Sequence, residues 1–476
     1  MICTGSNSFN RMTRFLFSFL VFAHFLVPLY GQTQTSDPAV IAANTAPSPG
    51  SAEPAAEPAP APKPASPQQA ATRPRLDIYG FAMLDMGYQF RQNDPDWFDV
   101  IRPTKLPAFA DEFGRDGHWY SSVRQSRFGV KSFSPTSIGE LRTTFEFEMF
   151  GVGADAGQTT IRLRHAYGEV GQVGAGQTWS VFMDPDVFPD SVEYWGPSGM
   201  VFFRNVQVRW MPIQGDTRLT VAIERPGASA DAGIYSERIE IQNINPRFPA
   251  PDVTAEFRYG GQKWGYVEAA GIVRKIKWDD VNTTDPFELS GSATGWGINL
   301  SSNIKIKRDT VKLQYVYGEG IENYFNDNPV DVGIKLNPGN PVTPFVGEPL
   351  PVTGIVAFLD HRWSERFTSS AGYSRVEVDN SDGQLPSAFK TGQYALANLL
   401  FRPVPNVMMG GEFQWGEREN FSDGFKSEDY RIQFSFKYDF SASIGVTRLR
   451  KAISSLYRDE DAVGSWAFFI ASGIPE

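Results

Sequence analysis

The chain has 476 residues, enough for two or three ordinary domains, and carries 54 acidic against 44 basic residues. The resulting net charge of −10, without a basic stretch that interleaves aromatic residues, argues against nucleic acid as a partner. The mean hydropathy is −0.30, and after the N-terminus no apolar run reaches the roughly 18 residues of a membrane helix. A helical membrane protein is therefore disfavoured. A transmembrane β-barrel is compatible with these values, because only every second residue of its strands faces lipid.

Residues 1–31 are predicted to be a cleaved signal peptide that exports the chain from the bacterial cytoplasm. Arg11 and Arg14 form its positive region, and the apolar stretch 15–30, "FLFSFLVFAHFLVPLY", is too short to be a membrane span. Cleavage would remove Cys3, the only cysteine. The mature chain would then have no disulfide, so its stability must come from hydrogen bonding and packing.

Residues 32–75 are predicted to be a disordered periplasmic linker. Ten of the forty residues in 36–75 are Pro, and most of the others are Ala, Ser or Glu. Such a segment cannot bury enough apolar surface to fold, and it should form an extended, semi-rigid spacer. The alternative is a docking segment for a periplasmic partner.

From residue 76 onward, apolar and polar residues alternate in segment after segment. "LDIYGFAMLDMGYQF" (76–90), "LRTTFEFEMF" (141–150) and "DYRIQFSFKYDF" (429–440) each have one apolar and one polar face. A period of two over such lengths predicts β-strands with one face in an apolar environment. Sixteen strands are predicted, at 76–90, 121–133, 140–150, 159–170, 173–182, 203–211, 217–225, 252–260, 263–275, 294–306, 310–318, 352–363, 366–378, 391–402, 406–417 and 429–440.

The connections between these strands alternate between tight turns and long loops. Short periplasmic turns and long outer loops are typical of outer-membrane barrels, and an even strand number leaves both barrel ends on the periplasmic side. A soluble sandwich would not need strands this long with faces so uniformly apolar. The sequence therefore predicts an all-β protein: a closed, transmembrane antiparallel barrel of about 16 strands over 76–440, in which the first strand pairs with the last.

The last predicted strand shows how such a barrel would use its two faces. Phe434 and Phe436 would face hydrocarbon, and Tyr438 and Phe440 would lie near an interface with water. The polar residues between them, from Arg431 to Asp439, would line a wet interior. Because the alternation stops at Phe440, the tail 441–476 is predicted to be a weakly ordered periplasmic extension that adds no strand.

The selective part of the channel is predicted in the long loop after the fifth strand, residues 183–202. Porins fold this loop inward, and a pore selects by its width and by the charges that line it. The loop carries the acids Asp184, Asp186, Asp190 and Glu193. Basic residues predicted to face the lumen on nearby strands are Arg127, Lys131, Arg142, Arg162, Arg164, Arg209 and Arg258.

These arginines would form a wall opposite the acidic loop and give a local preference for anions. The alternative is that single arginines pair with Glu146, Glu148 or the loop acids and only hold the loop. If Arg204 belongs to the strand, its side chain should face outward with those of Val206 and Val208; if it still belongs to the loop, the alternation says nothing about its direction.

Several motifs, taken together and in order, resemble the DcaP-like porins. The resemblance covers roughly 76–440 and implies a homotrimeric, sixteen-stranded outer-membrane channel that favours small organic anions, dicarboxylates especially. Family members often carry a periplasmic coiled coil before the barrel, whereas this chain has its Pro- and Ala-rich segment there. The motifs are "QSRFGVK" (125–131), "LRHAYGEV" (163–170), "GQTWSVFMDPDVFPDSVEYWGPSG" (176–199), "VQVRW" (206–210), "AIERPG" (222–227), "YGEGIENYF" (317–325) and "NLLFRPVPNVMMGGEFQWGERENFSDG" (398–424).

Other classes of function find less support in the sequence. His118, His165 and His361 have no ligand spacing, so neither a metal nor another cofactor is expected. An enzyme barrel would need a nucleophile and a base, and the cluster of Asp116, His118 and Ser121 matches no known motif. A plugged receptor would need a folded plug before the barrel. The main alternative to a porin is a structural or adhesive barrel whose outer loops bind a partner.

Overall fold

The computed structural model describes residues 74–282 and 284–445. The predicted signal peptide, nearly all of the predicted linker and the tail beyond residue 445 lie outside the described residues. Among the described residues, no helix has both the length and the apolar character that a membrane span requires.

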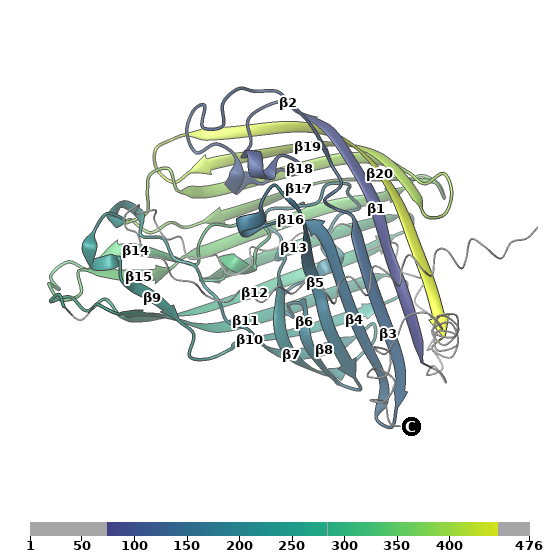
Figure 1. Cartoon of the computed structure of the whole chain (residues 1–476), viewed down its shortest axis with the longest axis horizontal. Coiled ribbons are helices and arrows are strands. Elements are labelled where there is room, and N and C mark those ends of the chain that lie inside the picture. Colours follow the sequence, from purple (N-terminus) through teal and green to yellow (C-terminus); the bar gives the residue numbers. More distant parts are fainter. Residues whose placement is uncertain (1–73, 283, 446–476) are drawn as a thin grey trace, which may run out of the picture. The chain divides into compact units, whose positions relative to one another are not determined.

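The described chain forms a closed antiparallel barrel, as the sequence predicts (Figure 1). Eighteen strand segments make up its sheet, but β2 and β3 both pair with β1, and β9 and β10 both pair with β11. Each of these two pairs is one interrupted barrel strand, so the barrel has sixteen. β1 pairs with β20 from Arg75↔Gly445 to Gln89↔Arg431, which closes the barrel.

The strands are β1 (Arg75–Gln89), β2 (His118–Ser122), β3 (Arg127–Thr136), β4 (Gly139–Phe150), β5 (Thr159–Val170), β6 (Val173–Trp179), β7 (Arg204–Ile213), β8 (Arg218–Glu224), β9 (Ile244–Arg247), β10 (Asp252–Gly261), β11 (Gly265–Asp280), β12 (Gly291–Ile306), β13 (Asp309–Glu319), β14 (Val332–Leu336), β15 (Phe345–Pro349), β16 (Pro351–Arg362), β17 (Phe367–Val378), β18 (Phe389–Phe401), β19 (Val407–Asn420) and β20 (Lys426–Gly445). Short 3-10 helices are η1 (Pro95–Trp97), η2 (Pro103–Lys105), η3 (Gly153–Asp155), η4 (Pro185–Val187), η5 (Gly233–Tyr235), η6 (Ile239–Ile241) and η7 (Glu322–Tyr324).

The two ends of the barrel differ as the loop lengths predict. Tight turns such as the two-residue turn between β5 and β6, where Gly171 has φ 60°, lie at the end where β1 begins and β20 stops. Positive φ at a two-residue turn matches the twist of the paired strands, and Gly adopts it without strain. The long loops lie at the other end, where β9, β14 and β15 project together from the barrel (Figure 1). β14 and β15 form a separate two-stranded sheet there.

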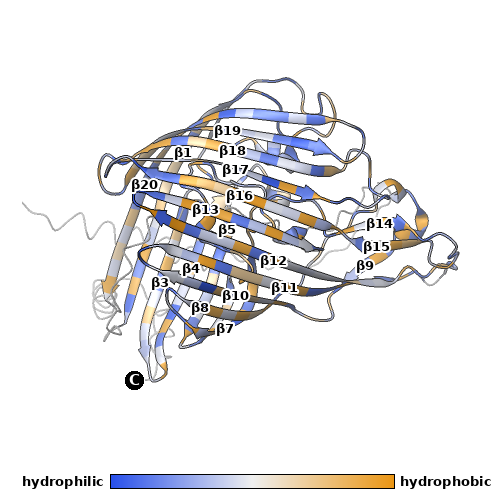
Figure 2. Ribbon diagram, turned by 180° about the vertical axis from the view of Figure 1, so that it is seen from behind, coloured by the Kyte–Doolittle hydropathy of each residue, from blue (hydrophilic) through white to orange (hydrophobic). Residues whose placement is uncertain are grey.

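The alternation of the sequence separates an outer from an inner face. Apolar and polar residues alternate along the strands in Figure 2. On β1 and β20, Leu84 and Phe434 are exposed on the outside, while Asp85 and Gln433 are buried on the inside. A barrel in lipid needs this arrangement, because each strand presents one face to hydrocarbon while its backbone groups are paired with its neighbours.

β20 departs from the sequence prediction in two ways. It continues past Phe440 to Gly445, and residues 441–445 pair with Arg75–Tyr79 of β1. Pairing requires only backbone groups, so a strand does not end where its alternation of side chains ends. Moreover Arg431, Gln433 and Ser435 are fully buried instead of lining water.

The barrel contains a hydrophobic core, which alternation alone did not predict. Inner-face residues of β11, β13, β16, β17 and β18 pack against apolar residues of the inward-folded loops. Phe182, Phe188 and Phe202 from the loop after β6 and Tyr324 and Phe325 from the loop after β13 are all fully buried in it. This core attaches the loops to one side of the lumen.

Candidate functional site

The loop between β6 and β7, residues 180–203 and here called the constriction loop, folds into the barrel as predicted. Hydrogen bonds to inward side chains anchor it all around the lumen. Glu224 of β8 accepts from the backbone N–H of Val181 at 2.9 Å, Ser374 of β17 accepts from the N–H of Gly199 at 2.8 Å, and Glu412 of β19 accepts from the N–H of Val192 at 3.1 Å. The anchoring strands lie on different sides of the barrel, so the loop is fixed as a unit.

Two of the predicted acids meet one of the predicted arginines. The Arg258 guanidinium lies 2.7 Å from Asp184 and 2.6 Å from Asp186, and it also contacts Glu268 at 2.5 Å. Its Cζ lies 3.6 Å from the centre of the Tyr266 ring. Arg258 is thus surrounded by carboxylates and holds the beginning of the loop against β10 and β11.

The other two predicted acids pair with arginines that the sequence analysis did not select. Asp190 lies 3.2 Å from Arg402, which is in the turn between β18 and β19. Glu193 lies 3.4 Å from Arg431 and accepts hydrogen bonds from the backbone N–H groups of Ile101 and Gly196. Burial raises the pKa of the Glu193 carboxyl to about 7, against the lowering effect of Arg431. The loop acids are therefore neutralised locally at three separate places.

The tip of the constriction loop meets two further segments that fold inward, residues 90–117 and 320–331. Trp195 donates to the backbone carbonyl of Asn326 at 2.9 Å. The Trp97 and Trp195 rings meet edge to face, and the Arg102 guanidinium lies against both, 4.1 and 3.9 Å from their centres, and pairs with Asp327 at 2.9 Å. This contact joins all three segments around one cation.

Three predicted arginines, Arg127, Arg162 and Arg164, come together on the inner faces of β3 and β5. Glu148 of β4 is their shared partner: Arg164 lies 2.6 Å and Arg127 3.1 Å from it. Arg164 also contacts Glu146 at 2.6 Å, and Arg162 lies within electrostatic range of Glu148 and Tyr194. Tyr194, from the constriction loop, donates a hydrogen bond to Glu148 and stacks on Phe150.

Three further arginines border this group. Arg204, at the start of β7, turns inward and lies 3.9 Å from Glu148, so it still behaves as a loop residue. Arg124, in the interruption between β2 and β3, stacks 3.8 Å from the centre of the Phe150 ring and lies 3.5 Å from Asp99. We call the whole set, Arg102, Arg124, Arg127, Arg162, Arg164 and Arg204, the arginine cluster.

The arginine cluster has more positive than negative charge. Its six guanidinium groups lie with the carboxylates of Asp99, Glu146, Glu148 and Asp327, and Arg127, Arg164 and Arg204 all share Glu148. The three guanidinium nitrogens of Arg124 have no hydrogen-bond partner among the described residues. Arg102, Arg124, Arg164 and Arg204 are buried, so an anion that enters the lumen would meet the positive charge of this face chiefly at the partly exposed Arg127 and Arg162.

The remaining predicted basic residues lie between the cluster and the short-turn end. Lys131 is exposed and lies 4.9 Å from the centre of the Tyr79 ring. Arg209 is half-buried and donates to Gln207 and to the backbone carbonyl of Trp179. Arg142 is half-exposed beside Glu140 and Glu169 close to the turn. Together they extend the basic face toward the short-turn end.

Sequence reasoning missed Arg102 and Arg124 for an identifiable reason. Both lie outside the alternating segments, in the first loop and in a strand interruption, where period-two parity assigns no direction. The available signal was aromatic: Arg102 follows Trp97 and Phe98 by a few residues, and Arg124 follows Trp119 and Tyr120.

Comparisons with known proteins agree with this architecture. The family model described as DcaP outer membrane protein matches residues 63–440. The outer membrane channel DcaP of Acinetobacter baumannii aligns with a TM-score of 0.64 and 20% sequence identity, covering 78% of this chain and 99% of that one. An anion-selective porin from Comamonas acidovorans aligns with a TM-score of 0.50 and 9% identity, covering 77% of this chain and all of that one. No curated protein sequence matches the chain.

The family match extends over most of the chain and includes every motif on which the sequence resemblance depends. The structural similarity independently supports the sixteen-stranded porin fold. The chain therefore belongs to the DcaP outer membrane protein family.

Proposed function

We propose that the chain forms a passive diffusion channel that prefers small organic anions, dicarboxylates in particular. The observation that carries this proposal is the excess of guanidinium groups over carboxylates in the arginine cluster. In a narrow, partly desolvated lumen, such an excess attracts anions and repels cations. The acids of the constriction loop do not cancel it, because Arg258, Arg402 and Arg431 already neutralise them.

The chemistry of arginine favours carboxylates over other anions. Guanidinium binds a carboxylate through two parallel hydrogen bonds, and it stays charged at any working pH. Contacts with the Trp97 and Trp195 rings and the ion pair with Asp327 hold the Arg102 guanidinium in place. A solute with two carboxylates would bridge two cations, then pass Lys131 and Arg209 toward the periplasm.

The functional unit in this proposal is a homotrimer, as the family resemblance implies. The size of the detergent-solubilised protein, measured by light scattering before and after heating, tests this part. A stable monomer with full channel activity would contradict it.

The selectivity is tested by reversal potentials of single channels under a salt gradient. Replacing Arg162 and Arg164 by Gln should lower the anion-to-cation permeability ratio about threefold or more, and should slow dicarboxylate uptake into liposomes more than uptake of a neutral sugar. The matched control replaces the same two residues by Lys, which keeps the positive charge but cannot form the two parallel hydrogen bonds of a guanidinium group. This control should retain the anion preference and lose part of the dicarboxylate preference. A wild-type channel that prefers cations would contradict the proposal.

One feature favours a structural or adhesive barrel as the second candidate. Ile239, Leu336 and Val342, in the projecting loops around β14 and β15, are exposed apolar residues of the kind found at binding surfaces. Single-channel conductance separates the two candidates, because an adhesive barrel closed by its loops would conduct no ions.

A further inference from the structure

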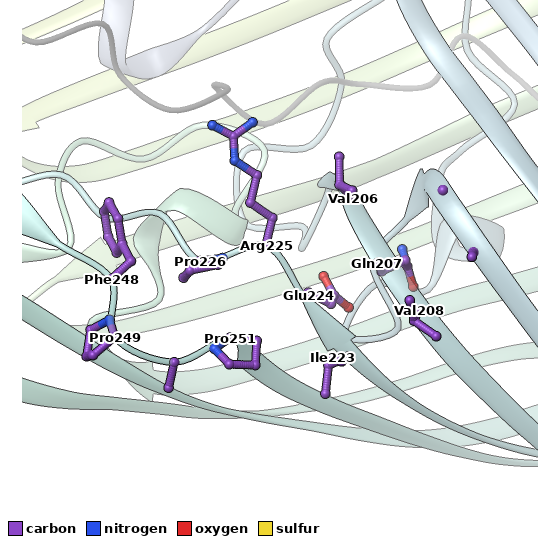
Figure 3. Close-up of a pocket in the computed structure, with 13 residues that line it drawn as sticks. Val206, Gln207, Val208, Ile223, Glu224, Arg225, Pro226, Phe248, Pro249 and Pro251 are labelled. Carbon is purple, nitrogen blue, oxygen red and sulfur yellow. The ribbon is translucent and has the colours of Figure 1, made fainter.

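The outer wall of the barrel contains a groove that the channel function does not use. It has a volume of about 520 Å³ and lies over β6, β7 and β8, beneath the segment 248–251 (Figure 3). Val206, Val208 and Ile223 form its floor, and Phe248, Pro249 and Pro251 form its edge. The groove is thus almost wholly apolar.

The alternation of the strands places this groove on the lipid side. Val206, Val208 and Ile223 are each about half exposed, whereas their sequence neighbours Gln207 and Glu224 are buried toward the lumen. The groove therefore faces the hydrocarbon chains of the membrane lipids.

Cations border the groove at its long-loop end. Arg225 directly follows β8 and is the next outward-facing residue after Ile223; it lines the groove (Figure 3). The row Ile223↔Val253↔Val273 runs across β8, β10 and β11, so Lys275, two residues beyond Val273, is the corresponding outward position on β11. Lys277 follows it. Arg225, Lys275 and Lys277 form no ion pair within residues 74–282 and 284–445.

These cations lie at the height expected for lipid headgroups. Trp264, in the turn before β11, and Tyr259, on β10, are exposed neighbouring aromatics, their rings 5.9 Å apart, as in an interfacial girdle. Lys275 comes eleven residues after Trp264. At about 3.3 Å per residue and a strand tilt of about 40°, that is a height of about 28 Å, close to the roughly 25 Å apolar band of such barrels.

The rim on the other side of the barrel has the opposite character. Over β17, β19 and β20 the outward positions near the long loops include Glu377, Glu417, Glu419 and Glu428. Arg375 pairs with Glu377 and Lys426 with Glu419. Cations at that rim are matched by acids. At the β8–β11 rim Arg247 pairs with Asp279, but Arg225, Lys275 and Lys277 have no such partner among the described residues.

We propose that this groove and its cations bind a phosphorylated glycolipid of the outer leaflet, with an acyl chain in the groove and a phosphate at Arg225, Lys275 and Lys277. Apolar surface for a chain lies beside Arg225, and Lys275 and Lys277 extend the outward cations to β11, two strands from β8. Apolar surface next to cations is the arrangement that an anionic lipid requires. A second copy of the barrel fits less well, since three unpaired cations would then be buried against protein at a desolvation cost.

Native mass spectrometry of the detergent-solubilised protein with added lipid A tests the proposal. The wild type should retain lipid A and bind its dephosphorylated form at least about tenfold less. Each cation near a membrane surface contributes about fivefold, so K275Q/K277Q should weaken lipid A binding about tenfold or more. The matched control R375Q/K426Q removes two cations from the opposite rim and should leave binding unchanged.

A substitution at the groove edge tests the acyl contact separately. Ala250 lies in the exposed segment over the groove, outside the barrel strands. A250W should fill the groove and weaken binding of lipid A and of its dephosphorylated form alike. The proposal would be overturned if K275Q/K277Q bound lipid A as well as the wild type does, or if the control R375Q/K426Q lost as much lipid A binding as K275Q/K277Q. A change of oligomeric mass in K275Q/K277Q without lipid would instead identify the surface as a subunit contact and overturn it as well.

Discussion

The two sides of the lumen differ in how they interact with the constriction loop. Against β11–β18 the loop docks through apolar packing, with Phe182, Phe188 and Phe202 buried among inner-face residues of the strands. On the β3–β7 side it contributes mainly Tyr194, which donates a hydrogen bond to Glu148 beside Arg127 and Arg164, while Trp195 contacts Arg102 of the inward-folded segment 90–117. The apolar side thus determines where the loop rests, and the proposed contact with solutes is assigned to the basic side.

This division also explains how an acidic protein can hold a basic passage. The loop acids lie at the margins of the apolar side, where Arg258, Arg402 and Arg431 neutralise them. On the opposite side, Arg127, Arg164 and Arg204 share one carboxylate, that of Glu148. Net charge of the whole chain therefore says little about the selectivity of the lumen.

Removing the apolar docking should have the largest effect. Replacing Phe182 and Phe202 by Ala should cost about 3–5 kcal/mol per ring, because both rings are fully buried and would leave cavities. The barrel should persist, since its backbone pairing does not depend on the loop. Single-channel recordings should show a larger and noisier conductance, and the loop should become sensitive to protease. The control F413A/F434A removes two lipid-facing rings and should leave conductance unchanged. Normal conductance in the Phe182 and Phe202 variant would show that polar anchors suffice to hold the loop.

Removing the acid at the centre of the basic side should have the next largest effect. Glu148 is fully buried and shared by Arg127, Arg164 and Arg204, so E148Q leaves these cations without their common counterion. Breaking a buried pair in this way costs about 3 kcal/mol or more. The charge excess also grows by one, so reversal potentials should shift toward stronger anion preference. If E148Q instead weakens that preference, the cluster holds the loop and does not select solutes.

Much of this architecture was predictable from the sequence, and the remainder was not, for physical reasons. Alternation identified sixteen barrel strands, because lipid imposes an apolar outer face on each of them. It did not show the interruption at 123–126 between β2 and β3, and it left β9 in a predicted loop. It failed inside β16–β18, where Val356, Phe358 and Tyr394 face inward and are apolar because the loop covers them. Alternation also cannot show which arginine meets which acid: Arg258 and Asp184 are 74 residues apart in sequence, and only the fold brings them together.

The junction between the two sides should respond to pH. Glu193 lies at that junction, and burial raises its pKa to about 7. Its protonated fraction therefore rises as the pH falls from about 8 to about 6, which removes the counterion of Arg431 and adds positive charge. Anion preference should increase moderately over this range. E193Q should show the stronger preference at every pH and no such dependence. If E193Q shows the same pH dependence of anion preference as the wild type, a group other than Glu193 is responsible for it.

The smallest effect is expected at the periplasmic end of the basic side, where solvent weakens each charge. Arg142 is half-exposed and pairs with Glu140 at 2.8 Å and with Glu169 at 3.7 Å. Exposed pairs of this kind contribute between about 0 and 1 kcal/mol, so R142Q should leave the free energy of unfolding nearly unchanged. Its effect on reversal potential should also be small, since salt screens charges beyond about 8 Å in physiological buffer.

Lys131 provides the comparison for Arg142, because its replacement also removes one positive charge but at a different place. Lys131 lies farther from the turns, on β3, four residues from Arg127 of the cluster. K131Q should therefore lower the anion preference more than R142Q, and the difference should grow as the salt concentration falls. Reversal potentials of both variants at about 0.1 M and about 1 M salt measure this dependence, because the screening length shrinks from about 10 Å to about 3 Å over that range. Equal effects of the two substitutions at low salt would mean that the basic side acts through its total charge. A larger effect of K131Q means that solutes respond to the position of each cation along the passage.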